Sequence, residues 1–140
     1  DPLPWIAAID VGVLPTYYVG ETLPNFVMEC QAQGKPVIAT DVAGIREMLT
    51  VDGALCGELI PLANDGRADV ASLAQAMNSY LHDSARRMAD GELAKRGALR
   101  FDIRATAAAY ERLFEEITLP PGQAHARLAE AIAVDVAAAG

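Results

Sequence analysis

Short apolar runs alternate with segments of helical periodicity along the first half of the chain. Residues 9–15 form an apolar run that ends at a proline, as expected of a buried parallel strand that leads into a loop. Residues 36–40 form a second buried run, and residues 55–61 supply a third. From Asn25, apolar positions recur at helical spacing, which predicts a helix. Gly34 is expected to end this helix, because a glycine commonly follows a helix C-terminus. The pattern predicts βαβ units on a parallel sheet.

The rest of the chain is predicted to be mostly helical. A short helix is expected near residues 44–49, and a clear amphipathic helix at 69–82, with Asp69 favourable at its positive end. Another helix is expected at 84–99, although Gly91 and Gly97 weaken that pattern. The apolar side of the helix at 69–82 is predicted to contain Val70, Leu73, Met77 and Leu81. A further helix after residues 101–103 has an apolar face marked by Ala107, Tyr110, Leu113, Phe114 and Ile117.

We therefore expect an α/β, Rossmann-like domain over residues 1–119. A Pro-Pro-Gly linker and an Ala-rich tail helix would follow over residues 120–140. Three predicted strands are about half the number in an open Rossmann-like sheet. The chain also begins with Asp1, without Met, directly before a core element. We expect it to be the second half of such a sheet, with the first half upstream in a longer protein.

Composition and charge exclude several classes of protein. The 140 residues are 52% hydrophobic and 21% charged, which is typical of a globular domain. The net charge of −8 argues against a nucleic-acid partner. No apolar run reaches the roughly 18 residues of a membrane span, and the N-terminus lacks the basic region of a secretory signal. Cys30 and Cys56 have no metal-ligand spacing, so we expect buried free thiols in a reducing cytoplasm.

Two glutamates, Glu21 and Glu29, carry the predicted chemistry. Glu21 lies in the loop after the first strand, and Glu29 lies on the helix that follows. Ligands of doubly wound sheets bind at the carboxyl ends of the strands, and a helix that starts near Asn25 would aim free N–H groups at a phosphate there. Carboxylates also accept strong hydrogen bonds from sugar hydroxyls. The arrangement fits a ligand composed of sugar, diphosphate and ribose, but two glutamates eight positions apart also occur by chance in many proteins.

The residues around this pair strengthen the prediction. The stretches 14–18, 20–25, 34–41 and 44–47 follow one another, with Glu29 between the second and the third. This succession resembles the family 4 ("group 1") glycosyltransferases, two-domain GT-B enzymes that include those assembling bacterial surface polysaccharides and lipid-linked oligosaccharides. The resemblance is dense over residues 9–61, extends through helix layout to about residue 117, and does not cover 118–140. This sequence departs from the family pattern at two points. Thr16 stands where family members commonly have Ser, and the threonine keeps the hydroxyl group. Family members also often have an extra residue near the first glutamate.

The resemblance implies roles for the residues that match the family motif. In that family the first glutamate contacts the hydroxyls of the transferred sugar, and the second holds the nucleotide ribose. Glu21 is thus the implied catalytic donor-sugar contact, and Glu29 the implied ribose contact. The residues implied to lie beside the donor sugar and diphosphate are Gly20, Thr22, Leu23, Pro24 and Asn25. The family needs no metal ion, and this sequence has no Asp-x-Asp motif and no His cluster.

The predicted parent enzyme transfers a sugar, with retention of configuration, from a nucleotide-diphosphate sugar to a saccharide or lipid-linked saccharide, in bacterial surface polysaccharide or glycoconjugate synthesis. The acceptor would bind a missing N-terminal domain, and a basic pair for the diphosphate also lies upstream in the family, so this chain alone is expected to be inactive. The expected location is the cytoplasm or the inner face of the membrane, with peripheral membrane association of the parent and no cofactor. Two alternatives remain: a non-catalytic donor-binding-like module for assembly or regulation, and a receiver-like domain that binds proteins.

Other polar and aromatic residues receive weaker interpretations. Asn25 has two compatible roles, as the cap of its helix and as a donor contact. Tyr17 and Tyr18 either stack near the site or pack against the helix layer, with packing preferred. Asp41 is expected to pair on the surface with the Arg-Glu sequence at 46–47. Neither histidine, at positions 82 and 125, is assigned a catalytic role.

Overall fold

The computed structural model of the chain describes residues 1–118. Contacts divide the chain into two compact units, Asp1–Phe101 and Asp102–Gly140. The first unit contains every strand among the described residues, and the second contributes one helix to them. The predicted linker at 120–122, the predicted tail helix and His125 lie outside the described residues.

A three-stranded parallel sheet with the order β1-β2-β5 organises the first unit, as the sequence predicts. Gly12 of β1 lies opposite Val37 of β2, and Val37 lies opposite Gly57 of β5. The outer edge of β1 has no partner strand among residues 1–118. The strands are β1 (Gly12–Leu14), β2 (Val37–Thr40), β3 (Thr50–Val51), β4 (Ala54–Leu55) and β5 (Gly57–Ile60).

The antiparallel hairpin of β3 and β4 was not predicted. Its two-residue turn consists of Asp52 and Gly53, which have φ values of 51° and 78°. Two successive residues at positive φ define the type I′ turn, for which Asp-Gly is a preferred sequence. The run at 55–61 is therefore divided, because Leu55 closes the hairpin and β5 begins only at Gly57.

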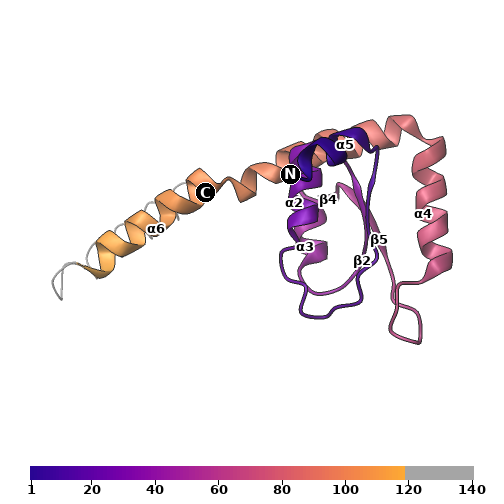
Figure 1. Cartoon of the computed structure of the whole chain (residues 1–140), viewed down its shortest axis with the longest axis horizontal. Helices are drawn as coiled ribbons and strands as arrows, with labels where there is room; N and C mark the ends of the chain where they lie inside the picture. Colours follow the sequence, from indigo (N-terminus) through magenta and orange to yellow (C-terminus); the bar gives the residue numbers. More distant parts are fainter. Residues whose placement is uncertain (119–140) are drawn as a thin grey trace. The chain divides into compact units, whose positions relative to one another are not determined.

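Helices cover both faces of the sheet, so the first unit has three layers (Figure 1). On one face α2 and α3 contact β2, and α5 packs along α2; on the other face α4 contacts β2 and β5. The parallel sheet between helical layers confirms the predicted α/β fold class. The helices are α1 (Leu3–Ala8), α2 (Asn25–Ala32), α3 (Ile45–Leu49), α4 (Val70–His82) and α5 (Ser84–Ala98), and the short 3-10 helix η1 is Leu99–Phe101.

The two faces of β2 belong to different hydrophobic clusters. Val37 and Ala39 join the cluster beneath α2 and α3, whereas Ile38 joins the cluster beneath α4 together with Ile60. Successive side chains of a strand point to opposite faces, which explains the division. All four residues of β2 are buried, as its continuous apolar sequence predicts for a central parallel strand.

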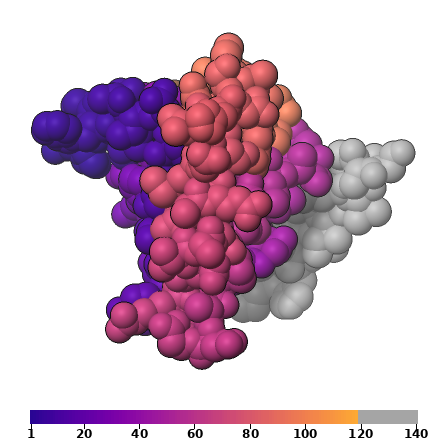
Figure 2. All heavy atoms as spheres, turned by 90° about the vertical axis from the view of Figure 1, so that its right-hand side faces the viewer, coloured from indigo at the N-terminus to yellow at the C-terminus, as the bar shows by residue number. Residues whose placement is uncertain are grey.

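The predicted apolar side of α4 is only partly correct. Val70, Met77 and Leu81 are 76%, 50% and 72% exposed, and the buried contacts are made by Ala76 and Tyr80. α4 occupies the middle of the face seen in Figure 2. It packs over β2 and β5 with Leu73 partly buried, and Met77 and Leu81 border a hollow of about 330 Å³ beside β1. The stripe is thus wider than the part of the sheet that α4 covers.

A charged cluster joins α4 and α5 at the amino end of β5. The guanidinium of Arg86 pairs with Glu58 and, at 3.4 Å, with Asp90. The Tyr80 hydroxyl donates to Asp90 over 2.6 Å. Burial, and then this hydrogen bond, raise the pKa of Tyr80 far above its ordinary value, so the hydroxyl remains a donor. The cluster lies at the opposite end of β5 from the carboxyl edge of the sheet, and we assign it a structural role.

The thiols of Cys30 and Cys56 are free and buried, as predicted. Burial, followed by the negative charge of Glu29, raises the pKa of Cys30 to about 11, and burial also raises the pKa of Cys56. The pKa of Cys30 is higher in the folded chain than the ordinary 9.0, so the folded state holds the thiol proton more tightly than the unfolded state. The contribution of this thiol to the free energy of unfolding is therefore complete below pH 9 and is lost as the pH rises towards 11.

We therefore expect Ellman's reagent to leave both thiols unmodified in the native chain near neutral pH. Burial keeps the reagent away, and the raised pKa values keep both groups in the unreactive thiol form. Unfolding in guanidinium chloride should release two reactive thiols. Rapid modification of the native chain would contradict the burial of these residues.

The second unit contributes α6 (Ile103–Ile117) to the described residues. The helix begins as predicted, and the carboxylate of Asp102 caps it by accepting from the Arg104 N–H over 2.9 Å. Its predicted apolar face is present and is exposed to solvent at Tyr110 and Phe114, whose ring centroids are 6.1 Å apart. No helix within residues 1–118 is both long and apolar enough to span a membrane.

Candidate functional site

Glu21 lies in the loop that leads from the carboxyl end of β1 to α2, where the sequence places it. The residue is half-buried. Its backbone is fixed on both sides, because the Glu21 N–H donates to the Tyr18 carbonyl over 3.1 Å and the Gly44 N–H donates to the Glu21 carbonyl over 3.4 Å. The side-chain carboxylate has no hydrogen-bond partner among the described residues, so it is available to a ligand.

Glu29 lies in the second turn of α2 and is also half-buried. Its carboxylate makes no ion pair within residues 1–118. Its charge adds to the effect of burial on the neighbouring Cys30 thiol, whose pKa is raised. The structure therefore places one free carboxylate before the start of α2 and one a turn inside it.

The first turn of α2 presents unsatisfied backbone donors at the same edge of the sheet. Pro24 is the N-cap residue, and its carbonyl accepts from Val27 over 3.0 Å and from Met28 over 3.5 Å. The N–H groups of Asn25 and Phe26 have no backbone acceptor in the described part of the chain. Such donors, together with the helix dipole, favour a phosphate group.

The interpretation of Asn25 as a helix cap is wrong. Asn25 is the first residue inside α2, and no side chain caps this end of the helix. Pro24 takes the N-cap position because its backbone, at φ −62° and ψ 121°, has the extended conformation that this position requires. The role of Asn25 as a donor contact stays a prediction.

Thr40, which sequence reasoning missed, anchors the loop that carries Glu21. Its hydroxyl is fully buried at the end of β2 and donates to the carbonyls of Leu14, over 3.5 Å, and of Thr16. The Thr16 hydroxyl in turn accepts from the Tyr18 N–H over 3.2 Å. The chain is thus held in place as it leaves β1, and the hydroxyl of Thr16 has a structural function. A buried threonine in an apolar strand was the only signal in the sequence.

Gly44 is the second residue that supports this loop. Its φ of −82° is accessible to any residue. However, a Cβ at this position would lie 2.4 Å from the backbone carbonyl oxygen of Thr22. The glycine is therefore required by the close approach of two backbone segments. The carboxyl end of β2 and the loop after β1 are in direct contact here.

Two tyrosines and one ion pair complete the surroundings of the loop. Tyr17 and Tyr18 are 64% and 66% exposed, so the interpretation that they pack against the helix layer is wrong. The Tyr18 ring instead lies beside Gly20, where a Cβ would be 2.6 Å from it. Asp41 and Arg46 form the expected surface ion pair, with Nε donating to Oδ1 over 3.0 Å.

No group of three or more side chains that could hold a metal ion occurs within residues 1–118.

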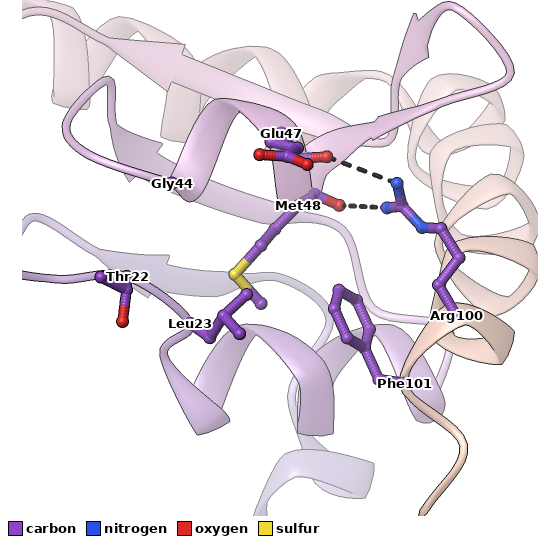
Figure 3. A pocket seen from close by; sticks show the side chains of 7 residues that line it. All are labelled: Thr22, Leu23, Gly44, Glu47, Met48, Arg100 and Phe101. Carbon is purple, nitrogen blue, oxygen red and sulfur yellow. Dashed lines mark hydrogen bonds between the residues drawn. The ribbon is translucent and has the colours of Figure 1, made fainter. Parts of the chain in front are cut away.

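A hollow of about 530 Å³ adjoins the loop on the side of α3. Two predicted donor-contact residues, Thr22 and Leu23, line it, but Glu21 and Glu29 do not. Figure 3 shows the side chains of Leu23, Met48 and Phe101 around the hollow, and the guanidinium of Arg100 directed at two carbonyl oxygens. The remaining lining residues are Gly44 and Glu47.

Residues 1–83 match the family described as "Glycosyl transferases group 1". Among curated proteins, the chain is 36% identical over 114 residues to D-inositol 3-phosphate glycosyltransferase of Corynebacterium jeikeium, a match that covers 81% of this chain and 25% of that protein. It is 35% identical over 111 residues to the lipopolysaccharide core biosynthesis mannosyltransferase LpsB of Rhizobium meliloti, covering 78% and 30%.

Two solved structures are similar in fold. Sucrose-phosphate synthase from Thermosynechococcus elongatus matches with a TM-score of 0.65 and 27% identity, over 81% of this chain and 26% of that chain. The Anabaena protein HepE in complex with UDP-glucose matches with a TM-score of 0.67 and 20% identity, over 82% and 30%. The chain belongs to the group 1 glycosyl transferases. It spans about a quarter of the length of the first curated relatives that it matches.

Proposed function

We propose that this chain is the donor-binding part of a glycosyltransferase that transfers a sugar, with retention of configuration, from a nucleotide-diphosphate sugar to a saccharide or lipid-linked saccharide. The observation that carries the proposal is the placement of three groups at the carboxyl edge of the sheet. Glu21 precedes α2, Glu29 lies in its second turn, and free backbone N–H groups at 25–26 lie between them along the chain. Such a sequence of groups suits a ligand that is a polyol at both ends and an anion in the middle.

Each group then has a chemical task. The Glu21 carboxylate accepts hydrogen bonds from hydroxyls of the donor sugar, and the Glu29 carboxylate accepts them from the ribose. The start of α2 faces the diphosphate and stabilises the negative charge that grows on it as the glycosidic bond breaks. The family resemblance suggests that basic residues upstream of this chain also neutralise the diphosphate, a task that a metal ion performs in other enzymes.

The names of the relatives support the substrate class and the setting. One is a glycosyltransferase acting on an inositol phosphate and another a mannosyltransferase of lipopolysaccharide core synthesis. We infer that this protein acts in cell-envelope polysaccharide or glycoconjugate synthesis, in the cytoplasm or at the inner face of the membrane. The acceptor domain is proposed to lie upstream, so the 140-residue chain alone is expected to show no transfer.

Replacing Glu29 by alanine in the full-length protein is expected to weaken nucleotide-sugar binding by at least roughly tenfold, or about 1.4 kcal/mol. The variant loses the ribose hydrogen bonds and keeps the helix, because alanine is a strong helix former. Isothermal titration with UDP-glucose and GDP-mannose measures the effect. The control is Glu92→Ala, which removes an equal charge from the surface of α5. Unchanged affinity in the Glu29 variant would refute the assignment.

A further inference from the structure

The hollow is lined by two predicted donor contacts, Thr22 and Leu23, and by five residues that have no assigned role in donor binding: Gly44, Glu47, Met48, Arg100 and Phe101. Its volume of about 530 Å³ lies within the usual range of small-molecule sites, roughly 300–1,000 Å³. Neither predicted donor carboxylate lines it. It shares one wall with the donor loop, because Thr22 and Leu23 directly follow Glu21. A ligand in the hollow would therefore lie beside the donor sugar.

One wall of the hollow is fixed by Arg100. Its guanidinium donates to the carbonyl oxygens of Met48 at 2.8 Å and Glu47 at 3.5 Å (Figure 3). It also donates to the carbonyl oxygen of Gly97 at 3.3 Å. The same guanidinium lies 5.5 Å from the centroid of the Phe101 ring, within the range of a cation–π contact. Arg100 is thus engaged with the protein itself, and it holds both the end of α3 and the aromatic ring in position.

The groups left open to a ligand are two oxygen-bearing side chains and an apolar surface. The Glu47 carboxylate is exposed and makes no hydrogen bond or ion pair with the described residues, and the Thr22 hydroxyl is exposed as well. Leu23, Phe101 and the side chain of Met48 supply the apolar part (Figure 3). A free carboxylate disfavours an anion, whereas it accepts strong hydrogen bonds from hydroxyl groups.

We propose that this hollow binds a saccharide ring, as an acceptor subsite on this chain. Hydroxyls of the ring donate to Glu47 and exchange hydrogen bonds with Thr22, while its C–H face lies against Phe101 and Leu23. The inference rests on the proposed glycosyl transfer and adds a place for the acceptor that the upstream domain alone would not provide. The shared loop brings the acceptor hydroxyl next to the donor sugar held by Glu21.

The test is an NMR titration of the ¹⁵N-labelled 140-residue chain, which separates this hollow from any acceptor site upstream. The probes are methyl α-D-glucopyranoside, methyl α-D-mannopyranoside and methyl α-D-galactopyranoside. At least one should shift the amide signals of Thr22, Leu23, Gly44 and Phe101 in a saturable manner. Glu47→Gln should weaken that binding about fivefold, because a neutral acceptor replaces a charged one. Phe101→Leu should weaken it by a similar factor.

The control Glu92→Gln removes an equal charge outside the hollow and should leave glycoside binding unchanged. Glu47 is exposed, so its variant keeps the test valid if Phe101→Leu unfolds. The subsite is refuted if no glycoside shifts these signals, or if Glu47→Gln binds as tightly as the wild type. Nucleotide-sugar binding by the full-length protein gives the separate readout. If it depends on Glu29 while glycosides fail to bind, the donor function stands and the subsite falls.

Discussion

Substitution of Gly91 by valine is expected to lower the free energy of unfolding by about 3 kcal/mol. A Cβ on Gly91 would lie 2.5 Å from the carbonyl oxygen of Gly34, at the point where α5 packs along α2. The obstructing atom is backbone, so no change of side-chain rotamer relieves the clash. Gly34 cannot move freely either, because it ends α2 at φ +66° with its N–H bound to the Gln31 carbonyl over 2.9 Å. α5 must therefore separate from α2.

Urea unfolding followed by circular dichroism measures this change. The matched control is Ala89→Val, which places the same β-branched side chain on an exposed position of α5. It should change stability by no more than about 0.5 kcal/mol. Equal midpoints for the two variants would mean that α5 does not approach α2 as closely as the structure shows.

Gly91 also shows where prediction from the sequence was limited. Helix propensity made Gly91 and Gly97 evidence against a helix at 84–99, yet α5 runs through both. Each glycine lies at a close contact, since a Cβ on Gly97 would be 2.6 Å from Val51 Cγ2. Tertiary packing therefore favours the residues that local propensity penalises. β1 and β2 were predictable because they lie in largely apolar runs, whereas β5 contains the charged Glu58 and was located only within the longer run at 55–61.

The candidate site also contains residues that the sequence predicts and residues whose role depends on tertiary packing. Glu21 and Glu29 were predicted as site residues because the stretches around them resemble the family motif, and the structure has them in the loop before α2 and in its second turn. Thr40 and Phe101 were not, because their importance depends on which segments meet in space. Thr40 contacts residues 14 and 16, and Phe101 joins a hollow whose other lining residues are more than 50 positions away, apart from Arg100. No local pattern records such distances.

Gly44→Ala is expected to weaken donor binding as strongly as the loss of the Glu29 carboxylate. The added methyl group would lie 2.4 Å from the Thr22 carbonyl oxygen, so the loop that carries Glu21 must move away from α3. A small displacement of a residue that positions a ligand has a large effect on how that ligand is held. We expect the full-length protein to lose at least roughly tenfold in affinity for the proposed nucleotide-sugar donor, about 1.4 kcal/mol. Isothermal titration with the donor that the wild type binds measures the loss.

The adjacent residue provides the control for this variant. Ala43 has a φ of +46°, a left-handed conformation that is unfavourable for alanine and natural for glycine. Ala43→Gly should therefore leave donor affinity unchanged and should not lower stability, although it alters the same turn. In Gly44→Ala the N–H that donates to the Glu21 carbonyl is retained, so a loss of affinity in that variant alone would arise from the methyl group. Retained affinity in Gly44→Ala would show that donor binding does not depend on the position of this loop.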